Sequence, residues 1–351
     1  SARMDKSNLF GVATNQKGVP LYALGAAWTV SSEPFWKCAT VEMLKLRGSF
    51  GYNGNIDRSL SAQTTATYFP ASGDPQNLLI GSGFARIENP PNPQLRWERV
   101  RTLNMGVDVS LWGGKLSGNV DVYRKDGLDL IGPTPFPGSS GVKRFTGNFA
   151  STKTHGIDLM LVGRPFKGAF SLESNFMFSL ARERVVDYQG SVALANYVRG
   201  LGSPMAGKPL YSVFSYRWAG LDPANGNPRG WIDGLPSVNY AALLSPSNVD
   251  GLEYHGSRRP VVFGAWRNTF GYKGFSLSVS ISYRAGYYFR RASIIYGNTY
   301  GLENGHGDYA LRWIVPGDEQ RTDVPSVPGA TDDRRDSFYS LSSVLVERGD
   351  H

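Results

Sequence analysis

Apolar and polar residues alternate with a period of two along much of the chain. The most regular stretch is 275–283, where a large apolar residue follows every serine. Successive side chains of a strand point to opposite faces, so this pattern predicts a strand with one apolar and one polar face. Eight segments alternate in this way: 21–30, 44–52, 103–111, 116–123, 157–161, 170–180, 262–272 and 275–283.

These segments form pairs, with short turns inside each pair and long connections between pairs. Turn sequences rich in Gly or Lys stand at 112–115, 166–168 and 273–274, and the first pair is joined by 31–42. The longer polar stretches are predicted to be loops and cover 53–95, 126–150, 185–258 and 291–340. Short turns at one end and long loops at the other are typical of an outer-membrane β-barrel with long extracellular loops. A soluble β-sandwich would show the same alternation and stays open as an interpretation at this point.

Composition narrows the class of protein. Aromatic residues make up 13% of the 351 residues, and charged residues only 19%, below the usual quarter for soluble domains. No run approaches the ~18 apolar residues of a membrane-spanning helix, so a membrane location would require a barrel. The net charge of +8 suits nucleic acid, a lipopolysaccharide surface or anionic substrates and decides nothing alone. Basic runs with interleaved aromatics are lacking, so no nucleic-acid partner is expected. Cys38 is the one cysteine and excludes an internal disulfide.

Patterns that signal catalysis or a bound cofactor are missing from the sequence. The four histidines are far apart, and none has the spacing of a metal site. Neither a phosphate-binding glycine loop nor a GxSxG nucleophile elbow occurs. Two carboxylates facing each other across a glycosidase cleft are an arrangement that spacing does not test. The sequence therefore predicts no enzyme, no cofactor and no metal.

Several motifs resemble one family, the SusC-like TonB-dependent outer-membrane transporters. The most specific is the segment NPQLRWERVRTLNMGVDVSLWGGKLSGNVDVYRKDGLDLI at 92–131. Further matching segments follow the order of the family and cover nearly the whole chain: 3–11, 25–37, 44–55, 147–161, 220–230 and 258–286.

The resemblance implies an all-β fold, in which residues 1–351 supply about eight strands to an antiparallel transmembrane barrel of ~22 strands. On this expectation the chain is a C-terminal portion of the barrel, cut at both ends, without the plug domain and the TonB contact segment. The remaining barrel segments and outer-membrane lipid would surround it.

The resemblance also implies active nutrient uptake across the Gram-negative outer membrane, energised by TonB and assisted by a SusD-like surface lipoprotein. An oligosaccharide is the leading substrate and a peptide the second. A passive outer-membrane pore and a soluble carbohydrate-binding β-sandwich are the alternatives.

Candidate site residues fall into two groups. Aromatic rings can stack on the apolar faces of sugars, and the stretch 185–258 is rich in them. We expect Tyr216, Trp218 and Trp231 to contact the substrate or the lipoprotein lid, unless they pack the loop against itself. The second group consists of charges on the polar, lumen-facing side of predicted strands: Arg47, Arg267, Arg284, Asp108, Asp121, Asp158 and Glu173. They could attract an anionic substrate, but pairing with one another across the wall is favoured.

Overall fold

The computed structural model describes residues 1–6, 18–55, 62–70, 82–135, 139, 142, 144–190, 192–200, 204–299 and 305–351. The chain divides into two compact units. The sheet unit comprises Ser1–Ser191, Met205–Gly207 and Val262–Tyr283, and the loop unit comprises Val192–Pro204, Lys208–Val261 and Arg284–His351.

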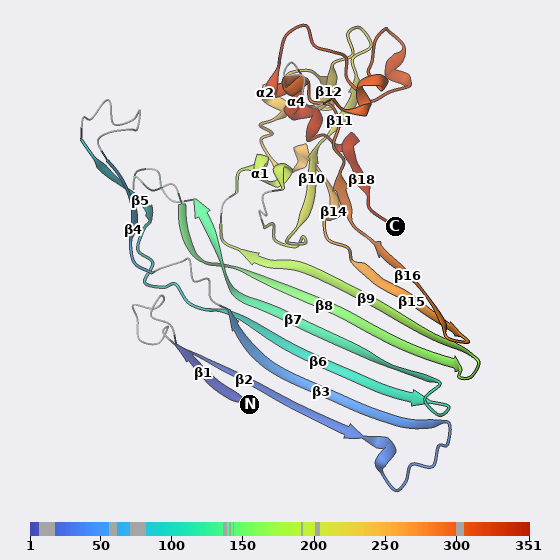
Figure 1. Ribbon diagram of the computed structural model, residues 1–351. Coiled ribbons are helices and arrows are strands. Elements are labelled where there is room, and N and C mark those ends of the chain that lie inside the picture. Colours follow the sequence, from blue (N-terminus) through green and yellow to red (C-terminus); the bar gives the residue numbers. More distant parts are fainter. Residues whose placement is uncertain are drawn as a thin grey trace. The chain divides into compact units, whose positions relative to one another are not determined.

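The dominant element is a nine-stranded sheet in the order β1-β2-β3-β6-β7-β8-β9-β15-β16 (Figure 1). Neighbouring strands run antiparallel. The strands are β1 (Ala2–Lys6), β2 (Gly18–Thr29), β3 (Val41–Asn55), β6 (Glu98–Leu111), β7 (Leu116–Pro135), β8 (Arg144–Phe166), β9 (Phe170–Tyr188), β15 (Val262–Tyr272) and β16 (Phe275–Ala285). All eight predicted strands are present, and β1 is a ninth that alternation did not reveal.

The predicted loop at 126–150 is wrong. Strand β7 continues to Pro135 and β8 begins at Arg144, with register shifts near Gly127 and Leu130. In this part of β7 the register shifts, Gly127, Gly132 and the prolines interrupt the alternation, although the backbone ladder continues. The predicted loop at 53–95 contains the hairpin of β4 (Thr65–Phe69) and β5 (Phe84–Asn89).

Register gives the sheet two distinct faces. Directly paired residues of neighbouring strands share a face, and Leu46, Val107, Val120, Leu159 and Phe178 form one such row on the apolar face. Arg47, the residue after Leu46 on β3, points to the opposite, polar face. Its row across the neighbouring strands contains Gly106, Asp121, Asp158 and Ser179.

The predicted tight turns join strand pairs at one end of the sheet (Figure 1). Lys273 and Gly274 both have positive φ, 46° and 89°, as a two-residue hairpin of the right twist requires. Trp112, Gly113 and Gly114 also have positive φ and link β6 to β7.

The loop unit turns much of the predicted loops 185–258 and 291–340 into ordered structure. Its sheets are β10 (Ser212–Tyr216) with β14 (Leu252–Ser257), β11 (Trp218–Leu221) with β12 (Pro228–Ile232) and β13 (Leu235–Ser237), and β17 (Tyr288–Arg290) with β18 (Val346–Arg348). Its helices are α1 (Leu194–Arg199), α2 (Tyr240–Leu243), α3 (Tyr296–Thr299) and α4 (Asp333–Ser340). Short 3-10 turns occur at Val30–Ser32, Val249–Gly251, Gly307–Leu311, Asp318–Gln320 and Ser343–Leu345. In the described part of the chain, each helix is too short or too polar to cross a membrane.

Candidate functional site

The core of the loop unit is an aromatic cluster around helix α4. Phe338 is fully buried, and the rings of Tyr216, Trp218 and Tyr240 lie 5.9–6.4 Å from its centroid. Tyr240 donates its hydroxyl to the carbonyl of Pro228 at 2.9 Å, and burial raises the pKa of this hydroxyl to about 12. This cluster holds β10, β11 and β12 together and thereby positions the side chains at their ends.

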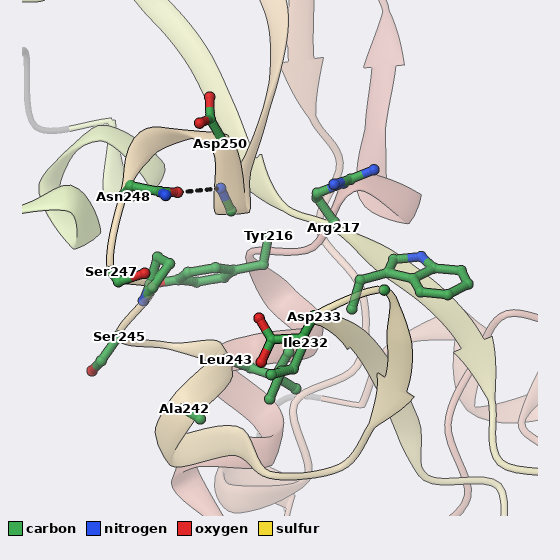
Figure 2. Close-up of a pocket in the computed structure, with 14 residues that line it drawn as sticks. Tyr216, Arg217, Ile232, Asp233, Ala242, Leu243, Ser245, Ser247, Asn248 and Asp250 are labelled. Atoms are coloured by element: carbon green, nitrogen blue, oxygen red, sulfur yellow. Dashed lines mark hydrogen bonds between the residues drawn. The ribbon is translucent and has the colours of Figure 1, made fainter.

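A cavity of about 470 Å³ opens beside this core. Its lining includes Tyr216, Arg217, Trp231, Asp233 and Leu243, from the ends of β10 and β12 and from helix α2. The segment Ser245–Gly251 closes the other side, where the Asn248 side chain accepts a hydrogen bond from the Gly251 amide. Figure 2 shows the ring of Tyr216 between the segment that carries Asn248 and Asp250 and the one that carries Asp233.

Of the three aromatic residues predicted to contact substrate or lid, two line this cavity. Tyr216 is only 3% exposed and donates its hydroxyl to the Leu244 carbonyl, so it forms the floor. Trp231 is 41% exposed, and its indole N–H donates to the Trp218 carbonyl at 2.9 Å, which orients the ring. Trp218 itself packs on Phe338 and Tyr339 and does not line the cavity.

The charged lining of the cavity was not singled out from the sequence. Arg217, Asp233 and Asp250 are exposed and form no ion pair within the described residues. Together with the Trp231 ring they offer one cation, two carboxylates and a flat apolar surface, a combination that can hold a polar, uncharged or zwitterionic ligand. Only the Asn-x-x-Gly spacing of Asn248 and Gly251 and the Asp-Gly turn at 233–234 could have signalled this site beforehand.

The predicted charges of the sheet form a network in its central strands. Arg47 donates from Nη2 to Asp108 at 2.9 Å and to Asp121 at 3.0 Å. Asn104 also donates to Asp121, at 3.0 Å. Asp158 is the direct register partner of Asp121 on β8. The structure therefore brings Arg47, Asp108, Asp121 and Asp158 to one place on the polar face.

The other three predicted charges lie apart from this network. Glu173 accepts hydrogen bonds from Arg164 at 2.9 Å and from Asn175 at 3.0 Å. Arg267 is the register partner of Asn175. The guanidinium groups of Arg267 and Arg284 take part in no ion pair with a residue that the structure describes.

One buried pair has the residue types of a nucleophile and its base. Ser215 Oγ lies 2.7 Å from His255 Nε2, and burial lowers the pKa of this histidine, with Arg290 adding to the effect. Ser215 is fully buried, so its hydroxyl has no access to a substrate. The pair therefore links β10 to β14. Within the described residues, no three His, Cys, Asp or Glu side chains cluster as a metal site would require.

The nine-stranded antiparallel sheet has one apolar and one charged face, as the wall of a large β-barrel requires. A profile of the family described as TonB dependent receptor-like, beta-barrel matches residues 1–298. The chain belongs to this family, and the expected all-β barrel fold and the resemblance to SusC-like proteins are confirmed.

Relatives and solved structures agree with this assignment. The chain is 31% identical over 189 residues to TonB-dependent receptor P39 of Formosa agariphila, covering 53% of this chain and 17% of the relative. It is 27% identical over 174 residues to TonB-dependent receptor SusC of Bacteroides thetaiotaomicron, covering 47% and 16%. The match therefore spans less than a fifth of these relatives. The structure of the RagAB peptide transporter has a similar fold, with a TM-score of 0.73 at 22% identity over 99% of this chain and 37% of that one.

Proposed function

We propose that this chain forms part of an outer-membrane transporter that imports a nutrient in a TonB-dependent manner. The observation that carries the proposal is the two-faced antiparallel sheet in a member of the TonB-dependent receptor-like β-barrel family. The apolar face meets lipid, and the face with Arg47, Asp108, Asp121 and Asp158 meets the lumen. On that face the ion pairs of Arg47 with Asp108 and Asp121 keep the wall polar and rigid.

The substrate we propose is an oligosaccharide, with a short peptide as the second candidate. The cavity of the loop unit supports both, since the Trp231 ring can stack on a sugar face while Asp233, Asp250 and Arg217 bind hydroxyl or charged groups. The fold likeness to a peptide transporter keeps the peptide in consideration. A SusD-like surface lipoprotein is the proposed partner that covers the site, and TonB the proposed source of energy.

A passive pore is the competing function, whereas family membership sets the soluble β-sandwich aside. We would express the full-length protein in a strain that lacks its own copy and measure uptake of labelled oligosaccharide and peptide panels. The same measurement in a strain without TonB separates the two functions. Active import predicts that uptake is lost there; unchanged uptake would establish a pore.

The cavity is tested by Trp231→Ala in the same assay. Its matched control is Trp112→Ala, because Trp112 is also an exposed tryptophan but lies in the turn between β6 and β7. Removing one stacking ring is expected to raise the half-saturating substrate concentration about tenfold in the first variant and to leave the second unchanged. Equal behaviour of both variants would exclude the cavity as the binding site.

A further inference from the structure

A cluster of cations stands on the same face of the sheet as the apolar band, next to one end of that band. Strand register places Arg101, Asp126, Lys153 and Arg184 in one row across β6, β7, β8 and β9. The next row contains Arg124, His155 and Arg182. We call the five Arg and Lys residues of these rows the basic cluster: Arg101, Arg124, Lys153, Arg182 and Arg184.

Only part of this charge is neutralised. Asp126 accepts from Arg101 at 2.6 Å and from Arg124 at 3.0 Å, and its own side chain is 6% exposed. Lys153, Arg182 and Arg184 form no ion pair within the described residues, and both arginines are exposed. Five cations therefore face one carboxylate, with three of them free to bind an anion.

The cluster directly borders the apolar band of the same face. The residues that follow it on that face are Leu103 on β6, Val122 on β7, Ile157 on β8 and Leu180 on β9. Since a strand rises about 3.3 Å per residue, Lys153 and Arg184 stand only ~13 Å from the first apolar residue of their strands, and Arg182 ~7 Å. This distance places them at headgroup depth rather than in an extramembrane loop.

The end of the sheet identifies the leaflet. The cluster lies toward the end of the sheet at which β6 begins and β9 leads into the loop unit, and beyond it β7 and β8 continue as a paired hairpin to Pro135 and Arg144. The turns at 112–115 and 273–274 lie at the opposite end of the strands. Outer-membrane barrels have short periplasmic turns and long extracellular connections. The basic cluster would therefore face the headgroups of the outer leaflet.

We propose that the basic cluster binds the phosphate groups of an anionic outer-leaflet lipid, a phosphorylated glycolipid of the lipid A kind. Charge complementarity selects this occupant, because arginine forks match phosphate oxygens in pairs and three unpaired cations next to an apolar band fit acyl chains joined to phosphates. The inference rests on the proposed outer-membrane location. It adds a specific lipid site to the wall, apart from the nutrient path on the opposite face.

The test uses the full-length protein purified from outer membranes in mild detergent. Native mass spectrometry would count retained lipid after addition of bisphosphorylated lipid A, dephosphorylated lipid A or phosphatidylethanolamine. The variant is Lys153→Gln with Arg182→Gln and Arg184→Gln. The matched control is Lys115→Gln with Lys167→Gln and Lys273→Gln, which removes the same charge from the turns at the other end of the strands. Heat-dependent gel mobility of each variant checks that the barrel is folded.

Preferential retention of bisphosphorylated lipid A by wild type and control, reduced at least about tenfold in the cluster variant, supports the proposal. Equal retention by both variants overturns it, as does full competition by millimolar inorganic phosphate, which would indicate a free-phosphate site. Binding of an acidic lipoprotein partner that is lost with the cluster variant while lipid binding is kept would also overturn it. If the cluster variant does not fold, the single variant Arg182→Gln is compared with the single control Lys167→Gln for retention of bisphosphorylated lipid A. Reduced retention by Arg182→Gln alone supports the proposal, and equal retention overturns it. These outcomes differ from a failure of the proposed transport function. That failure would appear as absence of the protein from the outer membrane or as uptake that continues without TonB.

Discussion

Arg47 of β3 donates a hydrogen bond to Asp108 of β6 at 2.9 Å, across the polar face of the sheet. Its guanidinium group lies over Gly106, and a Cβ atom built there would stand 2.9 Å from Arg47 Nη2 and 2.5 Å from Asp121 Oδ1. Because Gly106 has no side chain, the ion network can occupy the space that a Cβ atom would fill.

Gly106→Ala is expected to destabilise the barrel by about 1–3 kcal/mol, because the added methyl group displaces the Arg47 guanidinium from its carboxylates. The control is Gly48→Ala on β3, where a Cβ atom meets nothing within 4 Å. Thermal unfolding of the full-length protein in detergent, followed by gel mobility, measures both. Similar unfolding temperatures for the two variants would mean that Arg47 and its carboxylate partners move aside without loss of stability.

Arg335 is the polar centre of the loop unit. It is 3% exposed and donates to Asn227 Oδ1 at 2.8 Å and to the Ser326 carbonyl at 2.7 Å. Arg335→Met leaves both acceptors unpaired and is expected to cost about 3–5 kcal/mol of local stability. Hydrogen exchange of the amides around 225–228 and 326 would report the loss, and exposed Arg334→Met on the same helix should leave exchange unchanged.

His255 predicts a pH dependence of the pairing between β10 and β14. Burial lowers its pKa in the folded protein, whereas the unfolded side chain has its ordinary value of about 6.5. The unfolded state therefore takes up the proton first as the pH falls. Stability is unaffected above about pH 6.5 and decreases below it, until the lowered folded pKa is reached.

Hydrogen exchange of β10 amides at pH 7.5 and 5.5, corrected for intrinsic exchange rates, measures this loss. Gln in the variant His255→Gln is a polar partner for Ser215 that does not titrate. The protection of the β10 amides from exchange should therefore be the same at pH 7.5 and pH 5.5 in this variant. Glu253 opposes the shift and Arg290 strengthens it. Equal pH responses of wild type and variant would contradict the assignment.

Tyr240→Phe removes the hydroxyl that donates to the Pro228 carbonyl and is expected to cost about 1 kcal/mol. Because the folded pKa of about 12 exceeds the unfolded value of about 10, the contribution is complete below pH 10 and is lost as the pH rises toward 12. Exchange of the α2 amides, compared between the two proteins at pH 8 and near pH 11, would show the difference shrink. A constant difference would place the stabilisation outside this hydrogen bond.

Sequence reasoning succeeded where one physical rule acts locally. Alternation located the strands around the apolar band, since successive side chains of a strand there point to the apolar and the polar face in turn. It failed at 126–150, where register shifts, glycines and prolines interrupt the alternation along β7 although its ladder with β8 continues. Of the aromatic residues predicted to contact substrate or lid, Tyr216 and Trp231 line the cavity, and their contact with a ligand stays a prediction. Arg217, Asp233 and Asp250 were not singled out, because they gather there only through the fold of the loop unit.

By itself, the sequence determined the class of protein, its strands, its turns and the charged residues of the polar face. The strands, the turns and the face of each charge follow from periodicity and turn chemistry, which depend on neighbours along the chain. The class of protein follows from the resemblance of motifs such as 92–131 to one family. Tertiary structure alone decided which charges meet, that Gly106 makes room for Arg47, and that Arg101, Arg124, Lys153, Arg182 and Arg184 form one surface. Register between strands sets these relationships, and a shift of one residue would move every side chain to the opposite face.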